Sequence, residues 1–150
     1  MRRRNRHRRR RRHGATDTCR SGCHTGGVVP PDLLPHLRRA RDMADRHYAE
    51  PLDLGALAGA AHLSKYHFAR CFAETYGETP IRYLTRRRIE RAQDLLRSAN
   101  LTVTEVCMVV GFTSLGSFSS RFRELVGETP TRYRDRFAAE GVGSRSEQQQ

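Results

Sequence analysis

The heptapeptide Gly77-Glu78-Thr79-Pro80-Ile81-Arg82-Tyr83 recurs fifty residues later as Gly127-Glu128-Thr129-Pro130-Thr131-Arg132-Tyr133, with six identities in seven positions. Self-similarity at a fixed period indicates a repeated structural unit. Both copies carry the residues that end one helix and begin another, because Gly suits the position after a helix, Thr can cap the next helix, and Pro suits its first turn. The sequence therefore predicts two helix-to-helix corners, each preceded by a helix.

Two short helical patterns precede the first corner. Asp53 can cap the first of them, and its apolar face consists of Leu54, Leu57, Ala58 and Ala61. The pattern breaks at His62-Leu63, and Ser64 can cap a second helix that runs to about Tyr76, with an apolar stripe of Phe68, Cys71 and Phe72. Two short helices joined by a tight turn are typical of a helix-turn-helix unit.

The residues before the second corner repeat this pattern. Thr102-x-x-Glu105 forms a capping box, and the apolar residues after it match those of the first unit at an offset of 49: Val103, Val106, Cys107 and Val110. The turn Gly111-Phe112-Thr113-Ser114 is one residue longer, after which Phe118 and Phe122 match Phe68 and Phe72 at an offset of 50. The preserved phase on both sides of an insertion predicts a shared architecture.

The fold class predicted is all-α, with about seven helices in two helix-turn-helix subdomains joined by a long linker helix. A first helix should run from Asp32, as its N-cap, to about His47, and helical apolar spacing also predicts helices from Pro80 to about Ser98 and from Pro130 to about Ala139. The predicted organisation begins with a disordered Arg-rich leader (1–31) and a first helix-turn-helix subdomain (32–78). A linker helix (79–99), a second subdomain (100–139) and a disordered tail (140–150) follow.

The formal net charge of +12 is concentrated at the start of the chain. Nine arginines and no acidic residue lie between Arg2 and Arg12, and the rest of the chain carries +3. Such a block binds nucleic acid or anionic lipid without sequence preference. The leader is either a genuine arm of the protein or the result of a start codon assigned too early. No stretch is apolar enough for a membrane span or a signal peptide, and we expect a cytoplasmic, nucleoid-associated protein.

The sequence offers little for catalysis or metal binding. Cys19-x3-Cys23-His24 with His13 resembles part of a zinc site, but a dependable site has two paired ligand sets, so we predict no metal. Cys71 and Cys107 lie on apolar helix faces and are expected to be buried thiols. A phosphate-binding Gly-rich loop, paired carboxylates and a His-Glu-x-x-His motif are all missing, so we expect neither an enzyme nor a bound cofactor.

Two helix-turn-helix units on a rigid connector suit duplex DNA. A recognition helix fits the major groove, and successive grooves on one face of DNA lie roughly 34 Å apart. The predicted linker of 19 residues would span about 28 Å at ~1.5 Å per residue. One chain could thus read two adjacent major grooves, and because its two units differ in sequence, its site should be asymmetric.

The chain resembles the DNA-binding domain of the AraC/XylS family of bacterial transcription regulators. The resemblance covers about Asp32 to Arg134 and rests on Leu54 to Arg70, on the linker, and above all on Val106 to Phe112, Ser114, Phe118, Phe122 and Gly127-x-x-Pro130-x-x-Tyr133-Arg134. It implies seven helices, binding to promoter DNA and, in most members, activation of transcription. Many members also carry a ligand-binding and dimerisation domain, for which we expect no room here. Some DNA-alkylation repair proteins join such a domain to a cysteine-zinc domain, but the leader is too short and has only two cysteines.

Base contacts are expected mainly from the first recognition helix. Arg70 is the strongest candidate, since Arg can grip guanine O6 and N7 together, although an i,i+4 pair with Glu74 or a phosphate contact would also explain it. Lys65 and Tyr66 begin the same face, and Ala69 could contact a thymine methyl group. The second helix offers Leu115, Gly116, Ser117 and Ser120, which allow close approach but discriminate weakly.

Phosphate contacts are expected from cap hydroxyls and from arginines, namely Ser64, Ser114, Arg82, Arg86, Arg121 and Arg123. The arginines at 82, 86, 87, 88 and 91 surround the linker helix, so at least half of them should be solvated. We predict a monomeric, sequence-specific regulator of transcription that binds double-stranded promoter DNA. Activation is the expected mode of regulation, and RNA polymerase is a second candidate partner. The alternatives are a non-specific nucleic-acid binder driven by the leader and a DNA-binding fragment of a longer ligand-responsive regulator.

Overall fold

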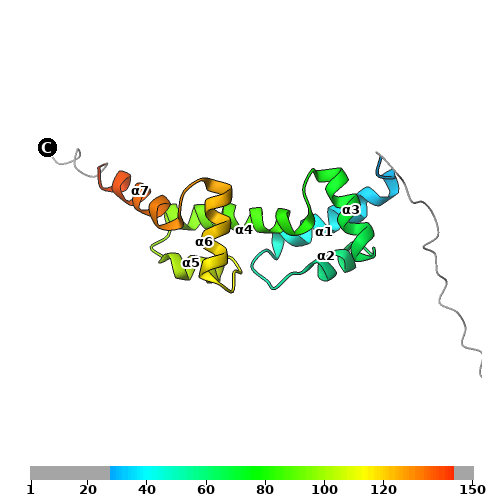
Figure 1. Ribbon diagram of the computed structural model, residues 1–150, viewed down its shortest axis with the longest axis horizontal. Helices are drawn as coiled ribbons and strands as arrows, with labels where there is room; N and C mark the ends of the chain where they lie inside the picture. Colours follow the sequence, from blue (N-terminus) through cyan, green and yellow to red (C-terminus); the bar gives the residue numbers. More distant parts are fainter. Residues whose placement is uncertain (1–27, 144–150) are drawn as a thin grey trace, which may run out of the picture.

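The computed structural model describes residues 28–143, and the side chains of residues 28–139, as an all-helical protein (Figure 1). A 3-10 turn is followed by seven α-helices, which confirms the predicted fold class. In chain order these elements are η1 Pro31–Leu33, α1 Leu34–Arg46, α2 Leu54–Ala60, α3 Lys65–Tyr76, α4 Pro80–Ser98, α5 Val103–Val109, α6 Leu115–Val126 and α7 Pro130–Gly143. Among these helices none combines the length and apolar composition that crossing a membrane requires.

Helix α4 lies along the middle of an elongated molecule and contacts both groups of helices. Helices α1, α2 and α3 pack against it at one end, and α5, α6 and α7 pack against it at the other. Each group encloses its own cluster of buried apolar side chains. The chain is therefore built as two small cores that share one helix.

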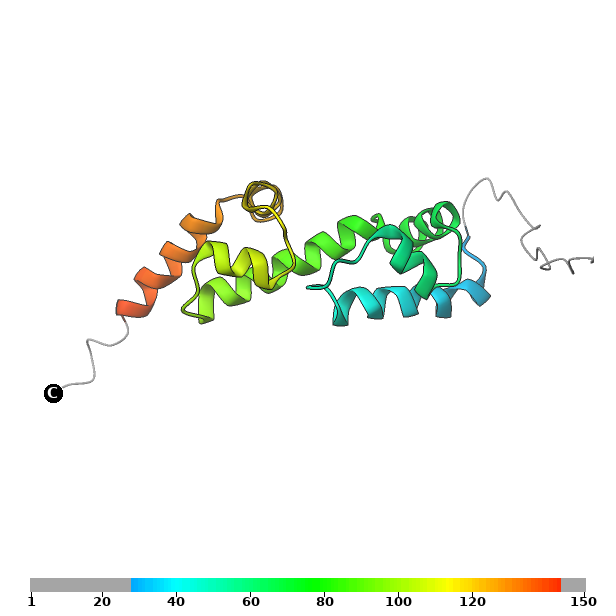
Figure 2. The same ribbon diagram turned by 90° about the horizontal axis from the view of Figure 1, so that it is seen from below.

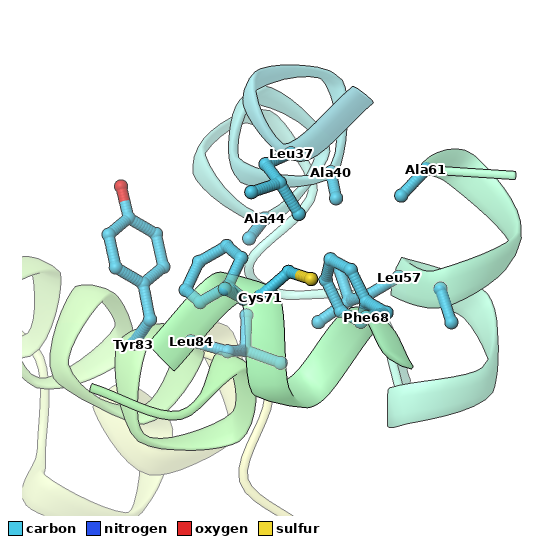
Figure 3. Close-up of a cluster of buried hydrophobic side chains, with 11 residues drawn as sticks. Leu37, Ala40, Ala44, Leu57, Ala61, Phe68, Cys71, Tyr83 and Leu84 are labelled. Atoms are coloured by element: carbon cyan, nitrogen blue, oxygen red, sulfur yellow. The ribbon is translucent and has the colours of Figure 1, made fainter. Parts of the chain in front are cut away.

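The first core lies between α1, α2, α3 and the start of α4 (Figure 3). Leu37, Leu57 and Phe68 are at most 1% exposed, and small residues of α1 such as Ala40 and Ala44 let the helices approach closely. Burying each large side chain contributes roughly 1.5–3 kcal/mol to folding. Tyr83 of α4 closes this core.

The second core repeats the first around the other end of α4. Phe118 and Phe122 of α6 are fully buried, as are Val106 and Val110. The ring centroids of Phe68 and Phe72 lie 5.4 Å apart and those of Phe118 and Phe122 lie 5.7 Å apart. The equivalence predicted from the sequence, at an offset of 50, is thus confirmed in three dimensions.

Both copies of the heptapeptide form the predicted corner. Gly77 and Gly127 adopt left-handed conformations, with φ of 76° and 91°, at the ends of α3 and α6. The hydroxyl oxygens of Thr79 and Thr129 each accept a hydrogen bond from the backbone N–H three residues later, at 3.4 and 3.3 Å. Each corner therefore ends one helix and caps the next as the sequence indicated.

The corners also share side-chain contacts that cross from one helix to the next. Tyr83 stacks edge-on against Phe72 at 5.6 Å, and Tyr133 does so against Phe122 at 5.4 Å. Arg86 pairs with the heptapeptide's Glu78 at 2.7 Å, and in the second copy Arg136 pairs with Glu128 at 2.5 Å. These contacts fix the direction of each helix after its corner.

The start of the first helix differs from the prediction. Asp32 was expected to cap it, but Asp32 lies inside the 3-10 turn, and α1 begins at Leu34 without a side-chain cap. The reason is the 3-10 turn that begins at Pro31, in which the N–H of Leu33 donates to the carbonyl oxygen of Pro30 at 3.0 Å and Asp32 is an inner residue. Val29, assigned to the leader, packs on the first core. Residues 1–27, with the possible zinc ligands His13, Cys19, Cys23 and His24, lie outside the described residues.

The last helix is longer than predicted. It runs to Gly143, past the expected end near Ala139, and so includes part of the stretch expected to be a disordered tail. Glycine disfavours a helix by only about 1 kcal/mol relative to alanine, so Gly141 does not terminate it. Residues 144–150 lie outside the described part of the chain.

Candidate nucleic-acid interface

Helices α3 and α6 lie on the same side of the molecule. Figure 2 looks along the axis of α6 and nearly along that of α3, and both stand on one side of α4. In Figure 1 the same two helices run upright, one in each subdomain. The second helix of each helix-turn-helix unit is thus presented on a common face.

Tight turns orient these two helices. His62 has a φ of 55° in the first unit, and Gly111, its equivalent in the repeat, has a φ of 88°. The hydroxyl oxygens of Ser64 and Ser114 then accept hydrogen bonds from the N–H groups of His67 and Ser117, both at 3.3 Å. Both predicted serine caps are confirmed, and their exposed hydroxyl groups lie at the positive ends of α3 and α6.

The outward face of α3 carries the side chains predicted for base contact. Tyr66 is 78% exposed, which is unusual for an aromatic residue that has no partner molecule. Lys65 is also exposed, whereas Ala69 and Arg70 are half-buried on the next turn of the helix. The structure therefore brings all four predicted residues onto neighbouring turns of one helix.

Arg70 is held by an acidic neighbour on the same helix. Its Nε donates a hydrogen bond to Glu74 Oε1 at 3.2 Å, and this hydrogen bond raises the pKa of Arg70. The i,i+4 pair weighed in the sequence analysis is thus present. Because a guanidinium group has five N–H donors, pairing at Nε orients the group and is compatible with a further contact.

The outward face of α6 carries shorter and less polar side chains than the outward face of α3. Leu115 is 44% exposed, and Gly116, Ser117 and Ser120 are exposed beside it. None of these side chains is long enough to span two acceptors of a base. A duplex could therefore approach α6 closely while meeting few directional donors.

Further along α6, two exposed arginines offer positive charge. Arg121 pairs with Glu124 at 2.6 Å, and Arg123 is exposed on the last turn. The pair is exposed on both sides, so it contributes little to folding. Arg121 can accordingly exchange its carboxylate partner for a phosphate at small cost.

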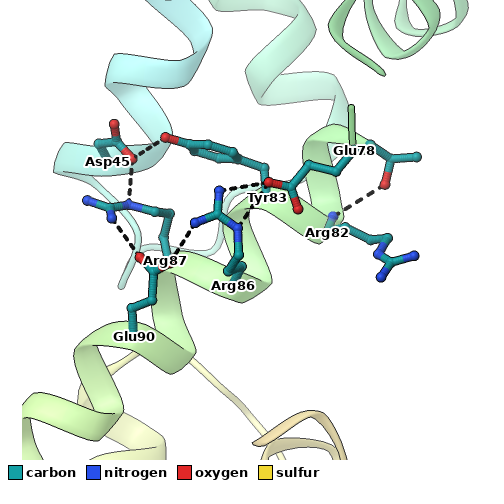
Figure 4. Close-up of polar contacts among 8 residues, drawn as sticks. Asp45, Glu78, Arg82, Tyr83, Arg86, Arg87 and Glu90 are labelled. Atoms are coloured by element: carbon teal, nitrogen blue, oxygen red, sulfur yellow. Dashed lines mark hydrogen bonds and ion pairs between the residues drawn. The ribbon is translucent and has the colours of Figure 1, made fainter. Parts of the chain in front are cut away.

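The arginines of α4 take part in a network within the protein, shown in Figure 4. Arg86 bridges Glu78 and Glu90, and Arg87 bridges Glu90 and Asp45 of α1. Tyr83 completes the network by donating its O–H to Asp45 at 2.8 Å. Arg86, predicted to contact phosphate, is therefore engaged at the corner, whereas Arg82 is exposed.

One exposed arginine was overlooked in the sequence. Arg132 occupies the place in the second heptapeptide that Arg82 occupies in the first, and both are exposed on the first turn of the helix after the corner. The repeat itself was the signal, because any role assigned to Arg82 extends to its equivalent.

The described residues hold no group of three or more His, Cys, Asp or Glu side chains that could bind a metal ion. Cys71 and Cys107 are free thiols, both buried as expected, and burial raises the pKa of each. A raised pKa keeps a thiol protonated and unreactive. The chemistry available on this side of the molecule is hydrogen bonding and charge.

Comparison with known proteins matches this geometry. A family model for a helix-turn-helix domain matches residues 57–136. The probable transcriptional regulator LumQ of Photobacterium leiognathi is 33% identical over 89 residues, which are 59% of this chain and 36% of LumQ. AdaA of Bacillus subtilis, a bifunctional transcriptional activator and DNA repair enzyme, is 31% identical over 90 residues, or 60% of this chain and 43% of AdaA. The chain thus spans less than half the length of these relatives.

Among solved structures, the DNA-binding domain of the global transcriptional factor AdpA, in complex with a target DNA, is similar to this chain. The TM-score is 0.67 at 32% identity, and the match covers 69% of this chain and 94% of that domain. The similarity therefore extends over nearly all of a domain whose structure was determined on DNA.

Proposed function

This chain belongs to the AraC/XylS-type helix-turn-helix family, and from that premise we propose that it regulates transcription by inserting α3 and α6 into adjacent major grooves of one promoter duplex. The observation that carries the proposal is the placement of both recognition helices on one side of α4 (Figure 2). The 19 residues of α4 span about 28 Å at ~1.5 Å per residue. That length suits two grooves separated by roughly one helical turn of DNA.

The first unit is proposed to supply most of the base recognition. Arg70 would donate two hydrogen bonds to guanine O6 and N7, with Glu74 keeping the guanidinium group in position. Tyr66 and Lys65 would contact bases or phosphates one turn earlier, and Ala69 would lie against a thymine methyl group. The second unit, through Leu115, Gly116, Ser117 and Ser120, would contribute close approach and weaker discrimination.

Phosphate contacts are proposed for the helix N-termini and for the exposed arginines. Ser64 and Ser114 cap α3 and α6, whose first N–H groups attract anions. The exposed arginines with this role would be Arg82, Arg121, Arg123 and Arg132. Arg86 is assigned to its corner, because two carboxylates already pair with it.

The wider setting of this function follows from the same premise. We propose that the chain binds its site as a monomer, since it carries two recognition helices of its own, and that it acts at the nucleoid. Activation through RNA polymerase is the proposed mode of regulation, supported by the description of the relative AdaA as a transcriptional activator. Transcription from the bound promoter in a purified system, with and without the protein, would separate activation from repression.

A non-specific binder is the second candidate, favoured by the nine arginines between Arg2 and Arg12. The test compares the full chain with a variant starting at Val28, which keeps Val29 on the first core. Affinity is measured for a selected promoter duplex and for its scrambled sequence at two salt concentrations. Retained preference for the promoter supports a specific regulator, and loss of nearly all binding to both duplexes supports the second candidate.

A further inference from the structure

The two subdomains meet at a junction beside the middle of α4. We define the junction as the loop Tyr48–Glu50 after α1, Arg88 of α4, and the turn Gly111–Phe112 between α5 and α6. In Figures 1 and 2 the loop after α1 approaches the α5–α6 turn where α4 passes from one subdomain to the other. The junction thus connects segments that lie between 23 and 64 residues apart in the chain.

Arg88 links α4 to this loop through two strong hydrogen bonds. Its Nε donates to the carbonyl oxygen of Tyr48 at 2.6 Å, and its Nη2 donates to the carbonyl oxygen of Glu50 at 2.7 Å. The guanidinium carbon also lies 5.8 Å from the ring centroid of Phe112 in the second unit. Burial lowers the pKa of Arg88, in contrast to the raised pKa values of Arg86 and Arg87 beside it. One side chain therefore contacts both subdomains from the helix they share.

Gly111 brings the second unit against the same loop. Its φ is +88°, and a Cβ atom at this position would lie 2.6 Å from the carbonyl oxygen of Ala49 and 2.9 Å from its carbonyl carbon. Cβ atoms in proteins essentially never make contacts that short. The neighbouring atoms here belong to the backbone, so a change of side-chain rotamer cannot relieve the clash. The close approach of the two subdomains therefore depends on the missing side chain.

Tyr48 contributes to both cores. Its ring packs against the cluster around Phe68 and also against the cluster around Phe118. A side chain shared in this way loses contact with one core if the subdomains rotate relative to each other. Packing and hydrogen bonding thus favour the same relative orientation.

We propose that this junction sets the half-site spacing that the protein accepts, by fixing the distance and rotation between α3 and α6. The proposal rests on the two-groove binding described above. One inserted base pair moves a half-site by about 3.4 Å and rotates it by on the order of 35° around the DNA. A rigid junction prevents the two subdomains from shifting and rotating to match the displaced half-site. Subdomains joined only through α4, without the contacts of the loop after α1, would have more freedom to do so.

The test measures the affinity of full-length variants for a panel of duplexes. The panel carries the selected site, the same site with one base pair added or removed between its halves, and sites with either half scrambled. The wild-type chain should prefer its own spacing over either neighbour by at least about tenfold. Arg88→Ala should reduce that preference to about threefold or less, with binding to each single half-site unchanged.

Gly111→Ala tests the close approach, and Gly127→Ala is its matched control. Gly127 has nearly the same φ, +91°, but nothing lies within 4 Å of a Cβ atom there. Both substitutions strain the backbone, and only Gly111→Ala also separates the two subdomains. We expect Gly111→Ala to flatten or shift the spacing preference and Gly127→Ala to preserve it. Arg88→Lys, which keeps the charge but lacks the two-pronged donor, serves as a second variant should Arg88→Ala fold poorly.

Three outcomes would overturn the proposal. An unchanged spacing preference in both Arg88 variants would mean that α4 alone fixes the geometry. A wild-type chain that binds both half-sites yet tolerates every spacing would show that the junction does not constrain the units. A wild-type chain indifferent to scrambling of the second half-site would instead refute two-groove binding itself, and the single half-site duplexes separate that result from the other two.

Discussion

The two corners of this protein are nearly identical, whereas the two recognition helices before them differ at most outward positions, with the pair Glu74 and Glu124 as an exception. At the corners, Gly ends a helix, Thr caps the next, Tyr packs on Phe, and Glu pairs with Arg in both copies. On the outward faces, Lys65, Tyr66 and Arg70 of the first unit correspond at the offset of 50 to Leu115, Gly116 and Ser120. The repeated corner residues set the direction of each helix, and the residues that differ between the two copies lie on the outward faces of α3 and α6.

This difference separates two kinds of constraint in one duplicated unit. The corner contacts are mutual, because each residue contacts another residue that is also repeated, so a change in one would leave its partner unsatisfied. The outward residues mainly face solvent, so they can change without disturbing the core. Matched changes in the two cores should therefore have equal effects, and matched changes on the two outward faces should have unequal effects.

The largest effects are expected in the cores. Phe68→Ala and Phe118→Ala remove equivalent, fully buried rings, and each should lower the free energy of unfolding by roughly 3–5 kcal/mol. Urea unfolding followed by circular dichroism would measure both. A difference of several kcal/mol between the two variants would contradict the structural equivalence of the two units.

The next effect should distinguish the faces. Arg70→Ala should weaken binding to the selected duplex by about tenfold to a hundredfold and relax the preference at one base pair. Ser120→Ala, at the equivalent position, should change affinity less than about twofold, because a serine makes at most one weak contact with a base. Titrations of both variants against duplexes with each base substituted in turn would measure these effects, and equal losses would refute the asymmetry.

A smaller effect concerns the two corner tyrosines. Tyr83→Phe removes the hydrogen bond to Asp45 at 2.8 Å and should cost about 1 kcal/mol of stability. Tyr133→Phe removes only a contact of 3.5 Å with Gln93 and should cost less. Urea unfolding of the two variants at neutral pH makes the comparison.

The same tyrosine should make stability depend on alkaline pH. Burial, with help from the Asp45 hydrogen bond, raises the pKa of Tyr83 to about 12, whereas an unfolded tyrosine titrates near ~10. Folding therefore favours the neutral form, so this contribution is fully present below about pH 10 and is lost as the pH rises toward 12. The stability difference between the wild-type chain and Tyr83→Phe should shrink over that interval, and a difference that grows would contradict the assignment.

The smallest effect is expected at a phosphate contact. Arg121→Ala should weaken binding to promoter and scrambled duplexes alike and reduce the slope of log affinity against log salt by about 0.9. Binding isotherms at four salt concentrations would measure the slope. A loss confined to one sequence would instead assign Arg121 to base recognition.

Most of the fold could be predicted because its signals are local. The helical spacing of apolar residues and the cap residues lie within a few residues of the helices they specify. These caps are Asp53, Ser64, Thr79, Thr102 and Ser114. Asp32 failed as a cap for an equally local reason, since the turn that begins at Pro31 takes Asp32 into a 3-10 helix before α1 begins. The outward face of α3 was also predictable, because a helix with a known buried stripe has a known exposed side.

The contacts that join distant segments could not be predicted. Nothing in the sequence around Arg88 indicates that it donates to carbonyl groups 38 and 40 residues earlier, and its neighbours Arg86 and Arg87 look the same in composition. Gly111 was identified as a turn glycine, but its approach to Ala49 depends on how the two subdomains pack. Local sequence patterns were enough to predict each helix-turn-helix unit. The packing of the two units against each other could be seen only in the structure.

Our claim that one scaffold presents two unequal DNA-reading faces can be tested by selecting bound duplexes from a random pool with the full-length chain. We expect an asymmetric site of two half-sites about one helical turn apart, with higher information content in the half-site bound by α3. Repeating the selection with Arg70→Ala identifies that half-site, because its information content alone should fall. A symmetric site, or a stronger half-site that is insensitive to Arg70→Ala, would contradict the claim.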